Sequence, residues 1–354
     1  MKIFENPLYQ EDVERIAKLD LPWEKLAGKS LVLTGATGLI GSMLVDVLMK
    51  KNGEGLSCRV YALGRSRERM EERFAYCYDS PLFSYVPYDA NGKLDLSEIR
   101  QADFLLHLAS NTHPRQYSLD PIGTITTNII GARDLLEYAA EHKVSRFLFA
   151  SSCEIYGENR GDTEKFREDY CGYLNSNTMR AGYPESKRCA EALCQAYKAQ
   201  KGLDVVIPRL TRSYGPTLLK TDTKALSQFL HCAVEGRDIV LKSAGTQYYS
   251  YLYVADSVSG LLTVLLKGEN GEAYNIADEA SDIRLKDLAA LIAGYAGRQV
   301  VFEVPDGVES AGYSKATKAR LDAGKLKTLG WSAQYDIKTG VERTIDVLKA
   351  LEQG

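Results

Sequence analysis

The chain has 354 residues, of which 45% are hydrophobic and 26% charged, and its formal net charge is −3 at pH 7. This composition permits a core of normal size, in one large α/β unit with a smaller lobe or in two domains. Because no block of like charges stands out and no apolar run is long enough to span a bilayer, neither nucleic acid nor a membrane is an expected partner.

Residues 1–28 are predicted to form a short helical extension, which Pro22 and Gly28 end. The first residues, MKIFENPLYQEDVER, contain no apolar signal core, so secretion is not expected. The seven cysteines are odd in number and lack paired spacing, which fits a reducing compartment better than a disulfide framework. No cysteine and histidine cluster has zinc spacing. We therefore expect a cytoplasmic protein without a metal.

The main part of the chain alternates between short apolar runs and segments with helical spacing. Buried strands are predicted at 30–34, 58–63, 104–108, 146–150 and 205–210. Helices are predicted at 38–51, 128–142 and 183–201. Strands that alternate with helices imply parallel βαβ units, so the expected fold is α/β with a Rossmann-type doubly wound parallel sheet.

The alternation loosens in the second half of the chain. From Gly215 onward the sequence mixes loops, a helix near 225–235 and shorter strands. This change predicts a smaller mixed C-terminal lobe that is interleaved with the main domain. We therefore divide the chain into an extension (1–28), a main domain (29–208) and a lobe (209–354).

A glycine-rich turn follows the first predicted strand and opens the first predicted helix. Such a turn lets the backbone approach a pyrophosphate, and the helix N-terminus supplies free amides and a partial positive charge. The alternative is a plain tight turn with packing glycines. The position directly after a buried strand favours dinucleotide binding. The expected contacts are Gly35, Thr37, Gly38, Leu39, Ile40 and Gly41.

The end of the second strand bears on the choice of dinucleotide. An acidic residue there would bind the ribose hydroxyls of NAD, whereas arginine accommodates the extra phosphate of NADP. The segment 63–67 reads LGRSR and holds no acid. The cofactor is thus NAD or NADP, with a slight preference for NADP through Arg65, although a solvated arginine is the alternative.

A tyrosine and a lysine lie four residues apart in YPESK, so Tyr183 and Lys187 share one face of the predicted helix. An ammonium beside a phenol is expected to stabilise the phenolate and lower the pKa of the tyrosine. Such a tyrosine can take a proton from a substrate hydroxyl while hydride leaves for a nicotinamide. The pair follows the motif SSCEIYG at 151–157, which lies at the carboxyl edge of the sheet where ligands bind.

These motifs, in this order, resemble those of the extended short-chain dehydrogenases/reductases, from about residue 29 to the end. The matching segments are TGATGLIG (34–41), HLAS (107–110), SSCEIYG, YPESK and RSYGP (212–216). That family includes nucleotide-sugar epimerases, 4,6-dehydratases and UDP-glucuronate decarboxylases. The resemblance implies that 29–208 binds NAD(P) and carries the catalytic residues, while 209–354 mainly binds substrate.

The resemblance also assigns residue roles. Tyr183 looks like the general base, Lys187 like its activator and ribose contact, and Ser152 like the catalytic serine that bonds the reacting sugar oxygen. The remaining cofactor contacts that it implies are Asp89, near the adenine, and Leu108, Ala109, Ser110 and Asn128.

Glu154 is the most informative residue in this frame. Dehydratases and decarboxylases of the family resemble this chain in carrying glutamate there, whereas simple 4-epimerases usually do not. Oxidation at carbon 4 makes the carbon 5 proton acidic, and a carboxylate can remove it. The alternative for Glu154 is a structural hydrogen bond. Cys153 is either a weak donor to substrate or a small buried filler.

The segment 107–131 looks most like the decarboxylase branch, but two positions depart from the family pattern. Tyr249 stands where the family has an arginine that holds the nucleotide phosphate, and Arg212 replaces an asparagine. The hypothesis is that one arginine has moved from one substrate-facing segment to another, so Cys153, Arg212 and Tyr249 are expected at the substrate. The predicted function is transient oxidation at carbon 4 of a nucleotide-sugar, followed by decarboxylation or 4,6-dehydration. The alternatives are a 4-epimerase and, more remotely, a non-catalytic dinucleotide-sensing scaffold.

Other positions have weaker signals. His113 and Arg115 follow the fourth strand on an expected active-site loop, where they touch substrate or are solvated. His231 is predicted to be packing or surface, and Trp331 to be core. Relatives pair the helices near 128–142 and 183–201, so a homodimer is expected.

Overall fold

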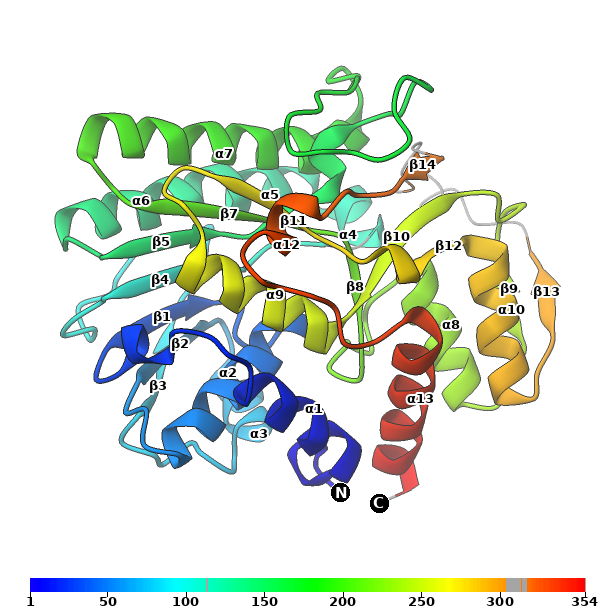
Figure 1. The fold of residues 1–354 in the computed structure, drawn as a ribbon, viewed down its shortest axis with the longest axis horizontal. Helices are drawn as coiled ribbons and strands as arrows, with labels where there is room; N and C mark the ends of the chain where they lie inside the picture. The colour runs from blue at the N-terminus through cyan, green and yellow to red at the C-terminus, as the bar shows by residue number, and fades with distance from the viewer. Residues whose placement is uncertain (113, 304–312, 314–316, 354) are drawn as a thin grey trace.

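The computed structural model describes residues 1–112, 114–303, 313 and 317–353. Within these residues the largest sheet has eight strands in the order β11-β7-β5-β4-β1-β2-β3, with β6 beside β7 (Figure 1). All of its pairings are parallel, and the strand order reverses next to β1, as in doubly wound folds. The predicted Rossmann-type fold is confirmed. The strands are β1 (Ser30–Thr34), β2 (Arg59–Gly64), β3 (Phe83–Pro87), β4 (Phe104–His107), β5 (Arg146–Phe149), β6 (Ser151–Ser152), β7 (Val205–Leu210) and β11 (Ala273–Ile276).

The central strands are buried on both faces, which explains why they read as continuous apolar runs. Alternate residues enter two separate cores: Leu31 and Leu33 of β1 pack into one, and Val32 packs into the other. Figure 1 shows α6 and α7 along one side of the sheet and α1 and α2 on the other. The first side carries α4 (Pro114–Leu119), α5 (Pro121–Thr126), η3 (Thr127–Gly131), α6 (Ala132–Glu141) and α7 (Gly182–Lys201); the other side carries α1 (Pro7–Ala17), α2 (Leu39–Gly53) and α9 (Val254–Lys267). A short helix, α3 (Arg67–Arg73), follows β2.

The predicted helix 128–142 is interrupted near its start. Residues Thr127–Gly131 form a π-helical turn between α5 and α6. Single π-helical turns inside helices are rare and are often found at functional sites. This turn carries Asn128, which is fully buried.

The second half of the chain builds a smaller lobe, as predicted, and also returns to the main sheet. Strand β10 pairs with β8, β12 and β14, and β9 pairs with β13. Strand β11 pairs with β7, so the two parts are interleaved. The lobe contains β8 (Arg212–Tyr214), α8 (Ala225–Val234), β9 (Ile239–Leu241), β10 (Tyr248–Tyr253), η6 (Glu279–Ser281), β12 (Asp282–Arg284), α10 (Leu285–Ala296), β13 (Val300–Phe302), β14 (Lys318–Ala319), α12 (Gly324–Lys327) and α13 (Ile337–Gln353).

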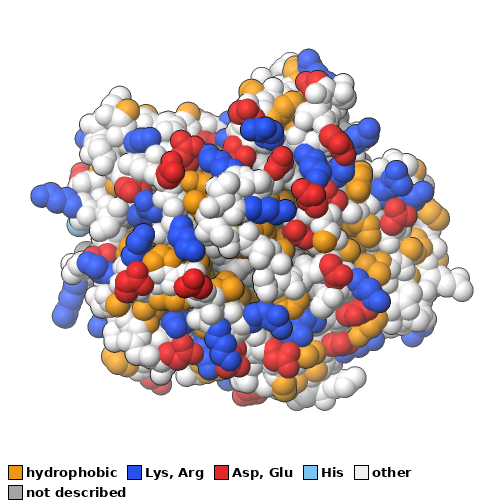
Figure 2. All heavy atoms as spheres, in the orientation of Figure 1, with side chains coloured by type: hydrophobic (Ala, Val, Ile, Leu, Met, Phe, Trp, Pro, Cys, Tyr) orange, Lys and Arg blue, Asp and Glu red, His pale blue; other side chains and the backbone are white. Residues whose placement is uncertain are grey.

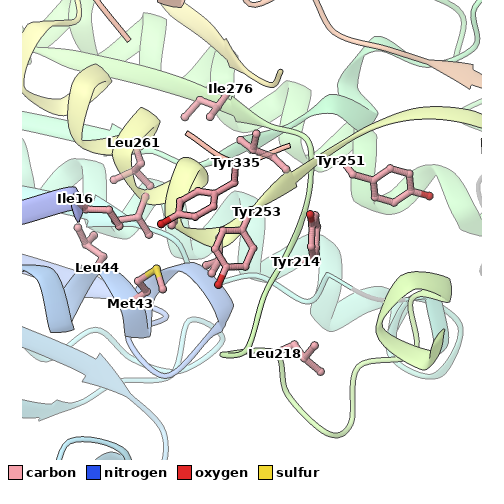
Figure 3. Packing of buried hydrophobic residues seen from close by; sticks show 14 of the residues in the cluster. Ile16, Met43, Leu44, Tyr214, Leu218, Tyr251, Tyr253, Leu261, Ile276 and Tyr335 are labelled. Atoms are coloured by element: carbon pink, nitrogen blue, oxygen red, sulfur yellow. The ribbon is translucent and has the colours of Figure 1, made fainter. Parts of the chain in front are cut away.

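The N-terminal extension joins the main domain to the C-terminal lobe. It contains η1 (Ile3–Glu5), α1 and η2 (Trp23–Leu26). Asp12 of α1 is fully buried and accepts hydrogen bonds from the hydroxyls of Tyr253 and Tyr335, each at 2.6 Å, and it pairs with Arg343 of α13 at 2.8 Å. Figure 3 shows the rings of Tyr253 and Tyr335 between Ile16 of α1 and the lobe. The predicted helical extension is thus a packed part of the fold.

Two predictions on side chains outside the site can be checked. Trp331 is buried and donates a hydrogen bond to the Ser259 hydroxyl at 2.9 Å, so it is a core residue as predicted. His231 is half-buried on α8.

Figure 2 shows basic and acidic side chains intermixed over the displayed face, in line with the balanced charge. None of the helices that the structure describes is long and apolar enough for a bilayer.

Candidate active site

The predicted phosphate-binding turn lies between β1 and α2, and its geometry fits a dinucleotide. Gly35 has a φ of 73°, and a Cβ there would lie 2.9 Å from the backbone nitrogen of Ala109. Thr34 Oγ1 accepts the N–H groups of Leu108 and Ala109 at 3.1 Å, which ties this turn to the end of β4. Gly38 is the N-cap of α2 and supplies no side-chain cap, so the amides of the first helical turn can face an anion. The other predicted contacts lie in the same turn and at the start of α2: Thr37, Leu39, Ile40 and Gly41.

Arg65 and Asp89 are both exposed and lie near the same edge of the sheet. Arg65 follows β2, and Asp89 follows β3, which pairs with β2 in parallel up to Gly64 and Pro87. Asp89 accepts the backbone N–H of Asn91 at 3.0 Å. Both side chains are therefore placed at the carboxyl ends of adjacent strands, where a dinucleotide lies across such a sheet.

A hydrogen-bonded chain connects the end of β4 to the helix that carries the tyrosine and the lysine. The Ser110 hydroxyl donates to Asn128 Oδ1 at 2.8 Å, and Asn128 Nδ2 donates to Ser186 Oγ at 3.0 Å. Ser186 lies between Tyr183 and Lys187 on α7. The buried Asn128 therefore ties α7 to the loop after β4. Its contact with the cofactor stays a prediction.

Three predicted catalytic residues meet at the carboxyl ends of β5 and β6. Ser152 ends β6, and Tyr183 and Lys187 lie one turn apart at the start of α7. Lys187 is buried and donates to the Ala150 carbonyl at 2.8 Å, with its nitrogen 5.9 Å from the centre of the Tyr183 ring. The Ser152 side chain accepts the Glu154 N–H at 3.2 Å, which starts the short helix η4 (Cys153–Tyr156).

The electrostatics of Tyr183 differ from the sequence expectation. Burial raises the pKa of Tyr183, and the charge of Glu154 raises it further, while a hydrogen bond from Ser152 and the charge of Arg180 act in the opposite direction. Burial also lowers the pKa of Lys187 to about 7. The predicted fall in the tyrosine pKa is not found in this structure, because burial has the largest effect on the Tyr183 pKa and raises it.

Glu154 contacts a residue that the sequence reasoning missed. Its Oε2 accepts a hydrogen bond from Nη2 of Arg180 at 2.6 Å. The Arg180 guanidinium lies 4.7 Å from the ring centre of Tyr117, and that ring stacks on Tyr183 at 4.9 Å. Arg180 stands three residues before Tyr183, on η5 (Met179–Ala181), so helical spacing was a usable signal. Tyr117, on α4, gave no local signal.

The three predicted substrate residues also come together. The Arg212 guanidinium lies 3.5 Å from the centre of the Tyr249 ring, and its Nη1 donates to Cys153 Sγ at 3.7 Å. The cause is strand pairing: β8 runs beside β10, with Arg212 opposite Tyr251. Burial raises the pKa of Cys153, so its thiol stays protonated and can serve as a donor or a filler. The ring and the thiol that contact Arg212 are therefore uncharged, while the charge of Glu154 also acts on the guanidinium.

For two loop residues, the sequence allowed either contact with substrate or a solvated side chain. The Arg115 side chain is exposed, and its backbone N–H donates to Thr223 Oγ1 at 3.4 Å. His113 lies outside the described residues. Within the described part of the chain, no group of three or more histidine, cysteine, aspartate or glutamate residues could hold a metal ion.

The sequence of this chain matches a known protein family. The model of the NAD dependent epimerase/dehydratase family matches residues 31–277. The chain belongs to this family. The predicted likeness to the extended short-chain dehydrogenases/reductases of the nucleotide-sugar group is thereby confirmed, as is the prediction of an NAD-dependent enzyme. The residues of the glycine turn, with Asn128 and Lys187, are those that would hold the dinucleotide.

Several known proteins resemble this chain in sequence or in structure. UDP-glucuronic acid decarboxylase 1 of Danio rerio is 28% identical over 318 residues, which cover 90% of this chain and 72% of that protein. The Xenopus tropicalis protein of the same name is 29% identical over 319 residues, with coverages of 90% and 71%. A dTDP-glucose 4,6-dehydratase from Bacillus anthracis in complex with NAD has a TM-score of 0.77 at 22% identity, with coverages of 92% and 98%. A UDP-glucuronic acid 4-epimerase from Bacillus cereus with NAD has a TM-score of 0.76 at 22% identity, with coverages of 91% and 99%. The two structures support the fold.

Proposed function

We propose that the protein oxidises carbon 4 of a nucleotide-linked sugar transiently and then promotes chemistry at carbons 5 and 6, with decarboxylation of UDP-glucuronate first among the reactions and 4,6-dehydration second. The observation that carries the proposal is the Glu154 carboxylate, which Arg180 and Tyr117 link to Tyr183 and whose charge raises the Tyr183 pKa. A simple epimerase needs no such second acid–base group. The curated relatives named above, both UDP-glucuronic acid decarboxylases, support it.

Each residue of the site has a role in this scheme. NAD or NADP, held at the glycine turn, would supply a reversible hydride acceptor for the sugar. Tyr183 takes the proton of the sugar hydroxyl, and Ser152 donates a hydrogen bond to the same oxygen. Lys187, at its pKa of about 7, alternates between amine and ammonium near neutral pH and so can follow the proton on Tyr183. Glu154 acts next, on the proton at carbon 5 or as a relay during loss of carbon dioxide.

We assign an anion of the substrate to Arg212. Its guanidinium is packed between the Tyr249 ring and the Cys153 thiol, and both of these partners are neutral. The charge of Glu154 also acts on Arg212, but Glu154 itself bonds Arg180. Because the groups in direct contact with the Arg212 guanidinium are neutral, it can still gain from an anionic ligand, such as a diphosphate or a sugar carboxylate. The stacked pair supports the idea that Arg212 replaces the family arginine missing at position 249.

The reaction is tested by incubating the purified protein with UDP-glucuronate, UDP-glucose and dTDP-glucose, followed by mass spectrometry of the products. Loss of carbon dioxide identifies decarboxylation, and loss of water identifies dehydration. An unchanged mass with inverted stereochemistry at carbon 4 identifies a 4-epimerase and contradicts the proposal. No turnover together with dinucleotide binding would indicate a non-catalytic scaffold.

Glu154→Gln separates the two stages. The amide is nearly isosteric but cannot accept a proton at neutral pH, so oxidation at carbon 4 should proceed while product formation stalls. We expect the absorbance of reduced nicotinamide to accumulate on addition of substrate. A variant with the turnover of the parent would remove the support for a carbon 5 step and favour the epimerase.

Three further points belong to this proposal. The exposed Arg65 favours NADP, and a thermal-shift titration with NAD and NADP tests this preference.

A homodimer is proposed, because apolar side chains of α4, α5 and η3 are exposed: Leu119 (62%), Ile122 (75%) and Ile130 (41%). A monomeric mass by light scattering, at micromolar concentration, would contradict it. The cytoplasmic location stays a prediction.

A further inference from the structure

Arg180 occupies a position in the site that none of the steps above uses. Its Nη2 donates to Glu154 Oε2 at 2.6 Å, and the two side chains are only 14% and 20% exposed. Its guanidinium also lies over the Tyr117 ring at 4.7 Å, and that ring stacks on Tyr183 at 4.9 Å with an angle of 27° between the planes. One cation therefore contacts the carboxylate directly and contacts the tyrosine through a single aromatic ring.

The local structure holds this cation in place. Arg180 belongs to η5, which runs into α7, so its position relative to Tyr183 is set by one helical turn. Glu154 belongs to η4, which Ser152 caps on the opposite side of the site. Without Arg180, a rotatable carboxylate in a mostly buried place would lose its charge-assisted hydrogen bond, and several rotamers would compete.

We propose that Arg180 is a positioning residue, which holds the Glu154 carboxylate at the place beside Tyr183 from which it acts on the oxidised sugar. Arg180 acts through Glu154 and takes no part in bond making itself. This inference rests on the proposed function, in which Glu154 acts after hydride transfer. It adds the group that orients Glu154 for that step.

A purely structural ion pair would have different consequences. If Arg180 only stabilised the fold, its loss would lower both oxidation of the sugar and product formation, or neither. If it positions Glu154, its loss should mimic Glu154→Gln and should have no further effect once Glu154 is absent. A double-mutant cycle therefore distinguishes the two roles.

The test uses the full-length protein and compares Arg180→Gln, Arg180→Lys, Glu154→Gln and the double variant Arg180→Gln/Glu154→Gln. Arg180→Gln should let reduced nicotinamide accumulate and should slow product formation by about 10²-fold, the cost of a misplaced catalytic group. The double variant should be no slower than Glu154→Gln alone. Arg180→Lys keeps the charge and should recover part of the loss. Arg237→Gln is the matched control, since it removes an exposed arginine that pairs with Glu235 far from the site, and it should behave like the parent.

A second readout is independent of turnover. The parent, Arg180→Gln, Glu154→Gln and the double variant are unfolded in urea, and this cycle gives the coupling between the two side chains. A pair at 2.6 Å should show non-additive effects, whereas additive effects would overturn the inference even if the protein were inactive on every sugar tested. Coupling in unfolding without coupling in turnover would overturn the positioning role. An inactive parent chain would contradict the proposed function and leave the ion pair to be decided by unfolding.

Discussion

Tyr183 and Lys187 are both buried, and the pKa of each moves in the direction that removes its charge. Tyr183 is therefore protonated in this structure, and Lys187 titrates near neutrality. A substrate hydroxyl and the positive charge of an oxidised nicotinamide would both favour ionisation of Tyr183. The ionised form of Tyr183 is thus expected only when substrate and cofactor occupy the site.

Tyr183→Phe tests the general base. The change keeps the ring that stacks on Tyr117 but removes the titratable hydroxyl. Turnover should fall by about 10² to 10⁴-fold, while binding of the dinucleotide should persist. Steady-state kinetics and a thermal-shift titration measure the two effects. Parental turnover would show that another group carries the proton.

The burial of Lys187 predicts a pH dependence of stability. Its pKa is lowered from 10.5 to about 7, so between these values the unfolded chain holds more protons than the folded one, and the free energy of unfolding rises with pH. Lys187→Met should lack this contribution. Urea unfolding of both chains between pH 7 and 10 should show the parent gaining stability relative to the variant. Parallel curves would mean that the folded pKa is close to that of a free lysine.

At the scale of one element, the β1–α2 turn combines a strand end, a close backbone contact and a helix N-terminus. A Cβ on Gly38 would lie 3.2 Å from the Gly35 carbonyl oxygen, a tight contact within the protein itself. A larger side chain there would occupy the approach to the first amides of α2, where a pyrophosphate is expected.

Gly38→Val should therefore abolish dinucleotide binding. Gly53→Ala is the matched control, because it changes a glycine at the other end of α2 where a Cβ meets nothing within 4 Å. The measurement is the thermal shift caused by NAD and NADP, with circular dichroism to confirm the fold. Equal shifts for Gly38→Val and the parent would refute the placement of the cofactor.

At the scale of the whole molecule, the N-terminal extension connects two parts of the chain that are far apart in sequence. Asp12 on α1 binds Tyr253, at the end of the strand that carries Tyr249, together with Tyr335 and Arg343. This contact fixes the end of β10, the strand that also carries the Tyr249 ring beneath Arg212. The extension is thus positioned to influence the site without touching it.

Asp12→Ala should destabilise the protein strongly, because it removes the acceptor of the Tyr253 and Tyr335 hydroxyls. It also takes the buried carboxylate away from the largely buried Arg343, which is left with the exposed Glu11. Loss of one member of a buried ion pair costs about 3 to 5 kcal/mol. Glu14→Ala on the same helix removes an exposed pair with Lys18 and should leave the free energy of unfolding nearly unchanged. Urea unfolding of the three chains measures the difference. Similar stabilities for both variants would mean that α1 is not an integral part of the fold.

The sequence by itself determined the parts of this protein that depend on neighbouring residues. The strand–turn–helix at 30–53 follows from an apolar run, glycines and helical spacing, and Tyr183 and Lys187 share a helix face because they are four residues apart. The bounds of β1 and β7 were predicted to the residue. The order of these motifs was enough to identify the family.

Only the tertiary structure decided which distant residues meet and how they are charged. Tyr117, Glu154 and Arg180 come from three separate elements, and Arg212 reaches Tyr249 only because β8 pairs with β10. Asn128, on the π-helical turn, likewise bonds two residues that are distant in sequence, Ser110 after β4 and Ser186 of α7. The pKa of Tyr183 could not be foreseen from its spacing to Lys187, because it depends mainly on burial. The side chains that exclude water from Tyr183 come together only when the chain has folded.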